Sequence, residues 1–306
     1  MSSFERRIKK FAAFLIIAVA FLAASSSAAD RYSATGLVLQ VDRTKQIVVV
    51  SCESIPNVMD AMVMSFPVRD VKSLEGLKPG MKIDFTIATA KEFSYAEGIH
   101  IRAFQSLEND PSEANRLSIL ENMLSDTGRT KDALTVGQAV PDFKLVDQDQ
   151  QQVALSDFAG KVVAVTFVYV RCPLPNYCFR LSSNFAQLQK RFKNQIGRNL
   201  VLLTIIIDPV HDQPQSVKEY ARIWNADPKA WHFLTGSPAA IQQICARFDM
   251  KYYPDEALLV HSFHTVVIDR HARLASNIEG NDFTARQLGD LVETVMADSP
   301  YGLPPP

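Results

Sequence analysis

The alternation of apolar and polar residues divides the chain into two parts with different patterns. From residue 30, short apolar runs are separated by polar turns, which is the pattern of strands in an all-β domain. We expect five strands, at residues 36–41, 46–50, 61–68, 81–87 and 99–104. Because no long helical pattern interrupts them, residues 30–107 are predicted to form a small all-β barrel of the five-stranded OB type.

From residue 135 the apolar runs alternate with stretches of helical spacing, which predicts an α/β domain with helices on the faces of a sheet. Strands are expected at residues 143–146, 152–155, 161–170, 200–207, 231–234 and 265–268, and helices at 181–192, 216–224, 238–248 and 284–296. The run at 161–170 is rich in β-branched and aromatic residues, so this strand should be buried on both faces. The domain is assigned to 135–297, preceded by a linker at 108–134 with a short helix at Arg116–Leu124, and followed by a tail at 298–306.

Residues 1–29 have the pattern of an export signal. Basic residues between Arg6 and Lys10 precede an apolar run at 11–24, and small residues follow it up to Asp30. The run is shorter than a membrane-spanning helix usually is, so we predict a signal peptide cleaved near Asp30 and a mature protein in the periplasm. The alternative is an uncleaved anchor in the inner membrane, in which case only this segment contacts the membrane.

Charge and cysteine content narrow the classes of function. With 32 basic and 33 acidic residues the formal net charge is -1, and no basic stripe follows the N-terminus, which excludes a nucleic-acid partner. The four cysteines are too few to form the disulfide scaffold of a chain of 306 residues. In an oxidising compartment a free thiol needs a role, and metal ligation supplies one.

Two of the cysteines, Cys172 and Cys178, lie in the loop that follows the predicted buried strand and precedes a helix. Open α/β sheets place their chemistry at the carboxyl ends of strands, and a helix N-terminus lowers the pKa of a thiol. A metal-binding or redox-active dithiol fits this position, with inert core cysteines or a plain disulfide as the alternative. Cys245 lies in an apolar helical stretch and is expected to be a buried small hydrophobe.

The first domain contains a concentration of sulfur. Met59, Met62 and Met64 fall within six residues, and alternation along a strand places Met62 and Met64 on one face. Cys52, at the end of the preceding strand, can reach the same face across the hairpin. Thioether and thiolate ligands together favour Cu(I) over harder metals, whereas the alternative is that these methionines only fill a barrel core.

The segment Cys52–Val68 resembles the signature of the CusF-like periplasmic copper-binding domains. The resemblance implies that Met62 and Met64 are thioether ligands of copper and that Met59 occupies the capping position. Cys52 stands where that family usually has a histidine. The ligand set of this chain therefore departs from the family pattern at one position.

The second domain resembles the SCO/SenC family of copper chaperones, because five short motifs occur in the expected order. They are Pro141-Asp142-Phe143, the cysteine loop, Ile207-Asp208-Pro209, Phe233-Leu234-Thr235-Gly236 and His261-Ser262. The resemblance implies a thioredoxin-like fold that binds copper through Cys172, Cys178 and His261. Two thiolates and one imidazole suit Cu(I) and tolerate Cu(II).

Other residues near these motifs have less distinctive patterns. The two cysteines enclose five residues instead of the three that are usual in the family, which alters the direction of their sulfur atoms. His264 is an odd number of residues from His261 and should face the other way in an extended segment. Asp208 is expected to end a strand and Asp212 to cap the next turn, with orientation of the cysteine loop or partner binding as alternatives.

The function that these features favour is that of a periplasmic copper chaperone. By resemblance, its client is the CuA centre of cytochrome c oxidase, carried by subunit II, or another copper protein, and it assists oxidase assembly. One alternative is a thiol-disulfide oxidoreductase that acts on oxidase cysteines, with Cys172 and Cys178 as the redox-active pair. No proline directly precedes the strand expected opposite the dithiol, which counts against that enzyme. A copper storage or resistance protein is the other alternative.

Overall fold

The computed structural model describes residues 30–89, 93–103, 133–250, 252–255 and 258–297. The predicted signal peptide, the helix expected at Arg116–Leu124 and the predicted C-terminal tail lie outside these residues. Within the described ranges, none of the helices has the length and apolar character needed to cross a membrane.

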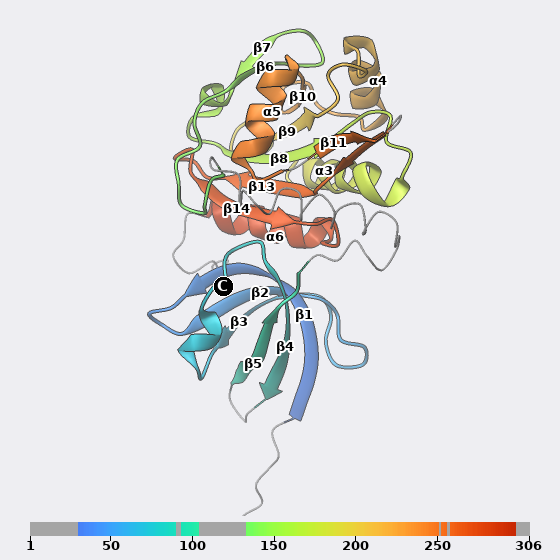
Figure 1. Ribbon diagram of the computed structural model, residues 1–306. Coiled ribbons are helices and arrows are strands. Elements are labelled where there is room, and N and C mark those ends of the chain that lie inside the picture. The colour runs from blue at the N-terminus through green and yellow to red at the C-terminus, as the bar shows by residue number, and fades with distance from the viewer. Residues whose placement is uncertain (1–29, 90–92, 104–132, 251, 256–257, 298–306) are drawn as a thin grey trace, which may run out of the picture.

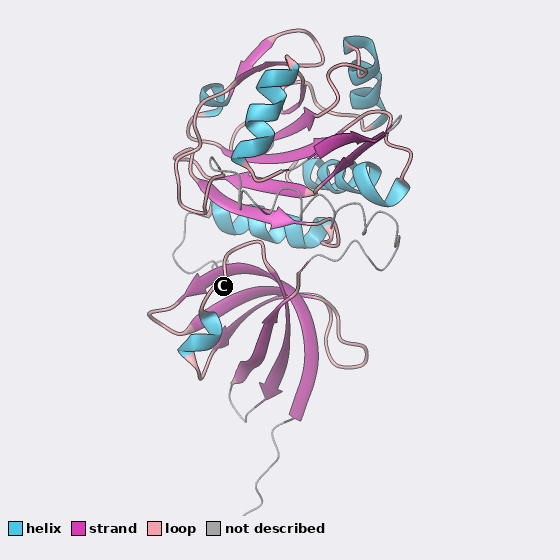
Figure 2. Cartoon of the chain, in the orientation of Figure 1, coloured by secondary structure: helices cyan, strands magenta, loops and turns pink. Residues whose placement is uncertain are grey.

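The first part of the chain is a five-stranded antiparallel sheet, with a short helical turn η1 (Val71–Leu74) as its one described helical element (Figure 2). Its strands are β1 (Asp30–Asp42), β2 (Ile47–Cys52), β3 (Val63–Pro67), β4 (Lys82–Thr89) and β5 (Ser94–Ile101), in the order β3-β2-β1-β4-β5. A parallel bridge between Val68 and Ala96 links the two ends of this order. Five strands are confirmed, but β5 begins earlier than expected, because polar residues interrupt its apolar pattern.

The middle of strand β1, residues 36–39, is buried on both faces, so this sheet packs against apolar side chains on two sides. Val38 and Val50 point into the core of the first sheet, where they join Phe66 and Phe85. On the opposite face, Leu37, Leu39 and Val49 belong to the core of the second part of the chain. Alternation along a strand explains this division, since neighbouring residues face opposite sides.

The second part has a five-stranded sheet with helices packed on it (Figure 1). The strand order is β10 (Trp231–Leu234), β9 (Leu200–Ile206), β8 (Val162–Val168), β13 (His264–Ile268) and β14 (Leu274–Glu279). Strands β8, β9 and β10 are parallel, whereas β13 is antiparallel to both of its neighbours. The helices are α3 (Arg180–Arg191), α4 (Pro214–Ile223), α5 (Pro238–Arg247) and α6 (Ala285–Met296). This arrangement is thioredoxin-like, as predicted.

Smaller elements complete this part of the chain. They are the hairpin of β6 (Lys144–Val146) and β7 (Gln152–Ala154), the hairpin of β11 (Tyr252–Asp255) and β12 (Leu258–His261), and the short helical turns η3 (Leu155–Phe158) and η4 (Pro175–Phe179). Strands β11, β12 and β14 have no predicted counterpart. In β14, buried and half-buried residues alternate, so its apolar run is too broken to be recognised from the sequence.

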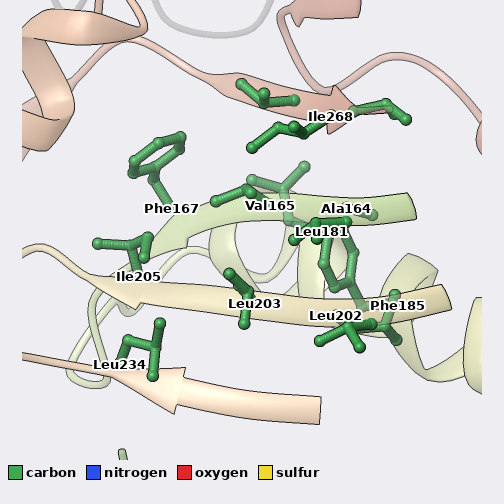
Figure 3. Close-up of a cluster of buried hydrophobic side chains, with 14 of the residues drawn as sticks. Ala164, Val165, Phe167, Leu181, Phe185, Leu202, Leu203, Ile205, Leu234 and Ile268 are labelled. Carbon is green, nitrogen blue, oxygen red and sulfur yellow. The ribbon is translucent and has the colours of Figure 1, made fainter. Parts of the chain in front are cut away.

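The central strands form the main core, and no residue of β8 is more than 2% exposed. This burial confirms that the strand is covered on both faces, as its continuous apolar run predicted. Figure 3 shows Val165 of β8 and Leu203 of β9 in this core, together with Leu181 and Phe185 of α3. The rigid core positions the loop that leaves the carboxyl end of β8.

Candidate metal centre

The loop after β8 carries both cysteines, and its second half is a short helical turn with a kink at Tyr177, whose φ and ψ are not helical. This turn, η4, begins at Pro175 and leads directly into α3, with Cys178 inside it. Cys178 is 1% exposed and Cys172 is half-buried, and both are free thiols.

His261, at the end of β12, faces Cys178. Its Nε2 atom lies 4.0 Å from the Sγ atom of Cys178, and its Nδ1 atom lies 2.9 Å from the carbonyl oxygen of Ser262. Because a carbonyl can only accept a hydrogen bond, Nδ1 carries the ring proton and the lone pair of Nε2 faces the sulfur. Burial lowers the pKa of His261 to about 4, so the imidazole is neutral at pH 7.

The two thiols have opposite protonation states. The hydrogen bond that Cys178 donates to Cys172 lowers the pKa of Cys172 to about 6. The same hydrogen bond, together with burial, raises the pKa of Cys178. At neutral pH the half-exposed Cys172 is therefore a thiolate, and the buried Cys178 keeps its proton. The site therefore combines one thiolate, one thiol and one neutral imidazole, which are donor types that suit a soft metal ion.

Aromatic side chains enclose this site, and the sequence did not reveal their role. Tyr169 is 3% exposed and its ring meets that of His261 edge-on at 5.9 Å. On another side, Phe263 lies 4.6 Å from the His261 ring, and Tyr177 lies 5.0 Å from Phe263. Tyr169 directly follows the last residue of β8, so its pattern was that of an ordinary strand residue.

A charged network holds the beginning of the cysteine loop. Asp212 accepts a hydrogen bond of 2.7 Å from the backbone N–H of Val170, and Arg171 forms an ion pair of 2.6 Å with Asp208. Asp208 also contacts His211 Nδ1 at 2.8 Å. These contacts show that Asp208 and Asp212 orient the cysteine loop, which was one of the two alternatives to their expected roles as strand end and turn cap. Asp208 also follows the end of β9 (Ile206), as expected.

His264 and Cys245 lie outside the cysteine loop. His264 begins β13, and its Nδ1 atom lies 2.9 Å from Asn277 Oδ1. Cys245 is 1% exposed within α5, and burial raises its pKa to about 12. Both arrangements agree with the structural roles that their positions in the sequence predicted.

The sulfur-rich group of the first sheet lies at the end of β2 and the start of β3. The backbone N–H of Cys52 donates to the carbonyl of Met62 at 2.9 Å, and Val50 pairs with Met64, so the register agrees with a shared face. Cys52 is fully buried in the apolar core of the first sheet, and Met59 and Met64 pack against that core. Met62 is 50% exposed, which leaves one thioether open to solvent.

The protonation of Cys52 distinguishes this group from the cysteine loop. Burial raises the pKa of Cys52 to about 12, so the thiol keeps its proton at neutral pH. A metal ion would have to displace that proton, whereas the thioethers of Met62 and Met64 are ready to bind without any change. The group therefore presents two neutral soft donors and one thiol that metal must deprotonate.

Across the described ranges, no three His, Cys, Asp or Glu side chains are already arranged to hold a metal ion. The Sγ atom of Cys172 lies 3.9 Å from the carbonyl oxygen of Leu174, and it also interacts with the thiol of Cys178. Cys178 in turn faces His261, so these three side chains are neighbours in the fold. The donor types fit a soft metal ion.

Comparison with protein families assigns the second part of the chain. The model described as SCO1/SenC matches residues 131–297. The chain belongs to the SCO1/SenC family. The SCO1/SenC match includes both loop cysteines, His261 and the whole second sheet, but none of the first. A model described as copper binding periplasmic protein CusF matches residues 31–95, which include Cys52 and the three methionines near it.

Individual relatives are distant, and each matches only part of the chain. An SCO2-like protein of Rickettsia typhi is 28% identical over 152 residues, which are 47% of this chain and 70% of that protein. Protein sco1 of Schizosaccharomyces pombe is 28% identical over 156 residues, 48% of this chain and 56% of that protein. A putative copper-binding protein of Stutzerimonas stutzeri is 28% identical over 119 residues, 38% of this chain and 55% of that protein.

Solved SCO1/SenC structures align with about half of the chain. ScoI of Arabidopsis thaliana with copper bound is 24% identical, with a TM-score of 0.47, and the alignment covers 53% of this chain and 100% of that one. An SCO1/SenC family lipoprotein of Bacillus anthracis is 21% identical, with a TM-score of 0.46, and the alignment covers 54% and 98% of the two chains.

Proposed function

We propose that this SCO1/SenC protein is a periplasmic copper chaperone that delivers copper to the CuA centre of cytochrome c oxidase subunit II or to another copper client. The single observation that carries the proposal is the pair of Cys178 Sγ and His261 Nε2, 4.0 Å apart, with the ring proton of His261 on Nδ1. The copper-binding names of the family models and relatives support the choice of metal.

The ligands of the proposed delivery site are Cys172, Cys178 and His261. Cys172 is a thiolate at neutral pH, and His261 is neutral with its Nε2 lone pair free for metal. Only Cys178 has to lose a proton when copper binds. Soft sulfur donors with one imidazole favour Cu(I), and the half-exposed position of Cys172 gives a client access to the metal.

A second copper site is proposed in the first domain, with Met62, Met64 and Cys52 as ligands and Met59 as the capping residue. We place it in an OB-type barrel over residues 30–107, with the SCO1/SenC domain at 135–297. The parallel bridge between Val68 and Ala96 supports the barrel, because it joins the outer strands of the sheet. The export signal at residues 1–29 belongs to the same proposal.

Copper stoichiometry of the full-length protein tests both sites. We expect two Cu(I) per chain for the wild type and one for Cys178→Ala, because the delivery site loses a thiolate. The variant Met62→Leu/Met64→Leu should also retain one, since it lacks both thioethers of the other site. Met250→Leu is the control for the methionine changes, because Met250 is buried in the main core. Unchanged stoichiometry in both site variants contradicts the proposal.

A second candidate function is supported by the unequal pKa values of the two thiols. The Cys172 thiolate can attack a client disulfide, which forms a mixed disulfide and releases one client thiolate. Cys178 then loses its proton and attacks the Cys172 sulfur, which releases the second client thiolate and leaves a Cys172–Cys178 disulfide. Two electrons pass to the client, and an external thiol reductant must restore the dithiol.

Metal-free protein distinguishes these two functions. A thiol-disulfide reductase reduces a disulfide peptide of subunit II catalytically when an excess of thiol reductant is present, and His261→Ala retains that activity because the imidazole is not needed. A copper chaperone restores the CuA absorbance of a reduced apo-subunit II only when it carries copper. In that assay His261→Ala is defective, which assigns the role to metal delivery.

A further inference from the structure

Helix α6 lies between the two sheets and packs against both of them (Figure 1). Its residues 287–292 are all buried, whereas a helix covered on one side would leave one face exposed. Leu37, Leu39 and Val49 of the first sheet share one apolar cluster with Leu288 and Leu291 of α6. A large apolar contact of this kind holds two domains in a fixed orientation.

The strand end that carries Cys52 is the part of the first sheet that α6 contacts through hydrogen bonds. Arg286 donates to the carbonyl oxygen of Cys52 at 2.5 Å and to Ser51 Oγ at 3.2 Å. The Ser51 hydroxyl donates to Asp290 at 2.7 Å, and Gln287 donates to the Ser51 carbonyl at 3.3 Å. The first turns of α6 therefore fix the backbone of the proposed ligand.

The turn that precedes α6 contacts the loop that carries the other proposed site. Asn281 donates through Nδ2 to the carbonyl oxygen of Asn176, between the two loop cysteines, at 2.8 Å. The next residue, Asp282, forms an ion pair of 2.9 Å with Lys82, which also pairs with Glu53 at 3.1 Å. Glu53 directly follows Cys52. Residues 281–287, the bridging segment, thus contact the backbone of Cys52 and the loop between Cys172 and Cys178.

We propose that copper passes from the site of Cys52, Met62 and Met64 directly to the site of Cys172, Cys178 and His261 in the same chain. The bridging segment keeps the two sites at a fixed distance and orientation for this transfer. The inference rests on the proposed function in that both sites must bind copper. Arg286 and Asn281 are its positioning residues, because each holds the backbone of one site.

The transfer is an exchange of ligands without a change of oxidation state. Cu(I) leaves two thioethers and the Cys52 thiolate, and it gains the thiolates of Cys172 and Cys178 and the imidazole of His261. Cys52 takes up one proton on release and Cys178 gives up one on binding, so these two changes balance. Thiolates hold Cu(I) more firmly than thioethers do, which favours movement toward the second site.

Confinement to one chain makes this route faster than exchange between chains. Sites in one chain have an effective concentration that reaches the millimolar range, far above the concentration of a second copy in dilute solution. The half-exposed thioether of Met62 provides the point where copper enters, and the half-buried Cys172 provides the point where it leaves. Both are on loops or strand ends, where side chains can move.

The test follows copper arrival at Cys172 in the full-length protein. One equivalent of Cu(I) as its acetonitrile complex is mixed with the metal-free protein, and samples are quenched with iodoacetamide, which alkylates Cys172 unless copper protects it. Mass spectrometry of the peptide measures the protected fraction. We expect a phase in the wild type whose rate is unchanged over a tenfold dilution, and which is absent from Met62→Leu/Met64→Leu.

Variants of the bridging segment test its role. Arg286→Ala and Asn281→Ala should each slow the concentration-independent phase about tenfold while two Cu(I) per chain are still bound. Arg222→Ala, an exposed arginine of α4, is the control and should leave the rate unchanged. A wild-type rate that falls in proportion to dilution, or a rate unaffected by both variants, overturns the inference. Loss of the two-copper stoichiometry in the wild type instead overturns the proposed function.

Discussion

His261 and Cys178 are 83 residues apart in the chain, yet Nε2 of the first lies 4.0 Å from Sγ of the second. The carbonyl of Ser262 fixes the ring orientation, because it accepts the Nδ1 proton. The imidazole therefore presents its lone pair to the sulfur before any metal arrives. Such preorganisation is typical of metal-ligating histidines, whose second nitrogen is held by a hydrogen bond.

The first prediction concerns the two histidines of this region. His261→Ala should lower the affinity of the delivery site for Cu(I) by on the order of 100-fold, since loss of an outer partner alone costs 10–100-fold at metal sites. Competition with a chromophoric Cu(I) chelator measures it. His264→Gln is the matched control, because His264 contacts Asn277 instead of the thiols. An equal loss of Cu(I) affinity in both variants would contradict a specific role of His261 as a ligand.

The second prediction concerns the pH dependence of Cys172. Its folded pKa of about 6 lies below the ordinary 9.0, so its alkylation by iodoacetamide should rise through pH 6 and be nearly constant above pH 7. In Cys178→Ala the midpoint should move upward, because the hydrogen bond that stabilises the thiolate is lost. Rates read by peptide mass spectrometry decide the matter, and a wild-type midpoint near pH 9 contradicts the assigned hydrogen bond.

The third prediction concerns Asp212, which is 2% exposed and accepts the N–H of Val170. Asp212→Ala leaves that donor without its partner and should lower the free energy of unfolding by about 1–3 kcal/mol. Urea denaturation of the full-length protein measures the change. Glu219→Ala, on the exposed face of α4, should have an effect within about 0.5 kcal/mol. Indistinguishable midpoints for the two variants would remove Asp212 from its structural role.

The fourth prediction separates backbone strain from contact between the sheets. Gly80 and Gly98 both have positive φ, at 90° and 58°, but a Cβ atom at Gly80 would overlap Ser276 of β14, whereas one at Gly98 meets nothing within 4 Å. Gly98→Ala should cost about 1 kcal/mol of stability from strain alone. Gly80→Ala should cost about 2–4 kcal/mol, because it also forces the sheets apart. Equal losses in urea denaturation would show that this contact is loose.

Local sequence patterns predicted the strands and helices well where apolar residues form a continuous run or a regular alternation. The run at 161–170 gave a strand buried on both faces, and the alternation around it gave the thioredoxin-like arrangement. The fifth strand of the first sheet was misplaced, because Glu97 and His100 interrupt its apolar residues. The kinked helical turn at Pro175–Phe179 was also missed, since a five-residue spacing between cysteines does not specify how the backbone turns.

What the sequence determined by itself was the inventory of chemistry: two cysteines after a buried strand, a sulfur-rich hairpin and a later histidine, because strand and loop patterns are local. Only the tertiary structure decided which of these side chains lie next to one another. The direction of the His261 ring, the wall formed by Tyr169 and the position of α6 between two sheets all depend on contacts between distant residues. Such contacts leave no periodic signal in either segment, since each segment would have the same pattern against another partner.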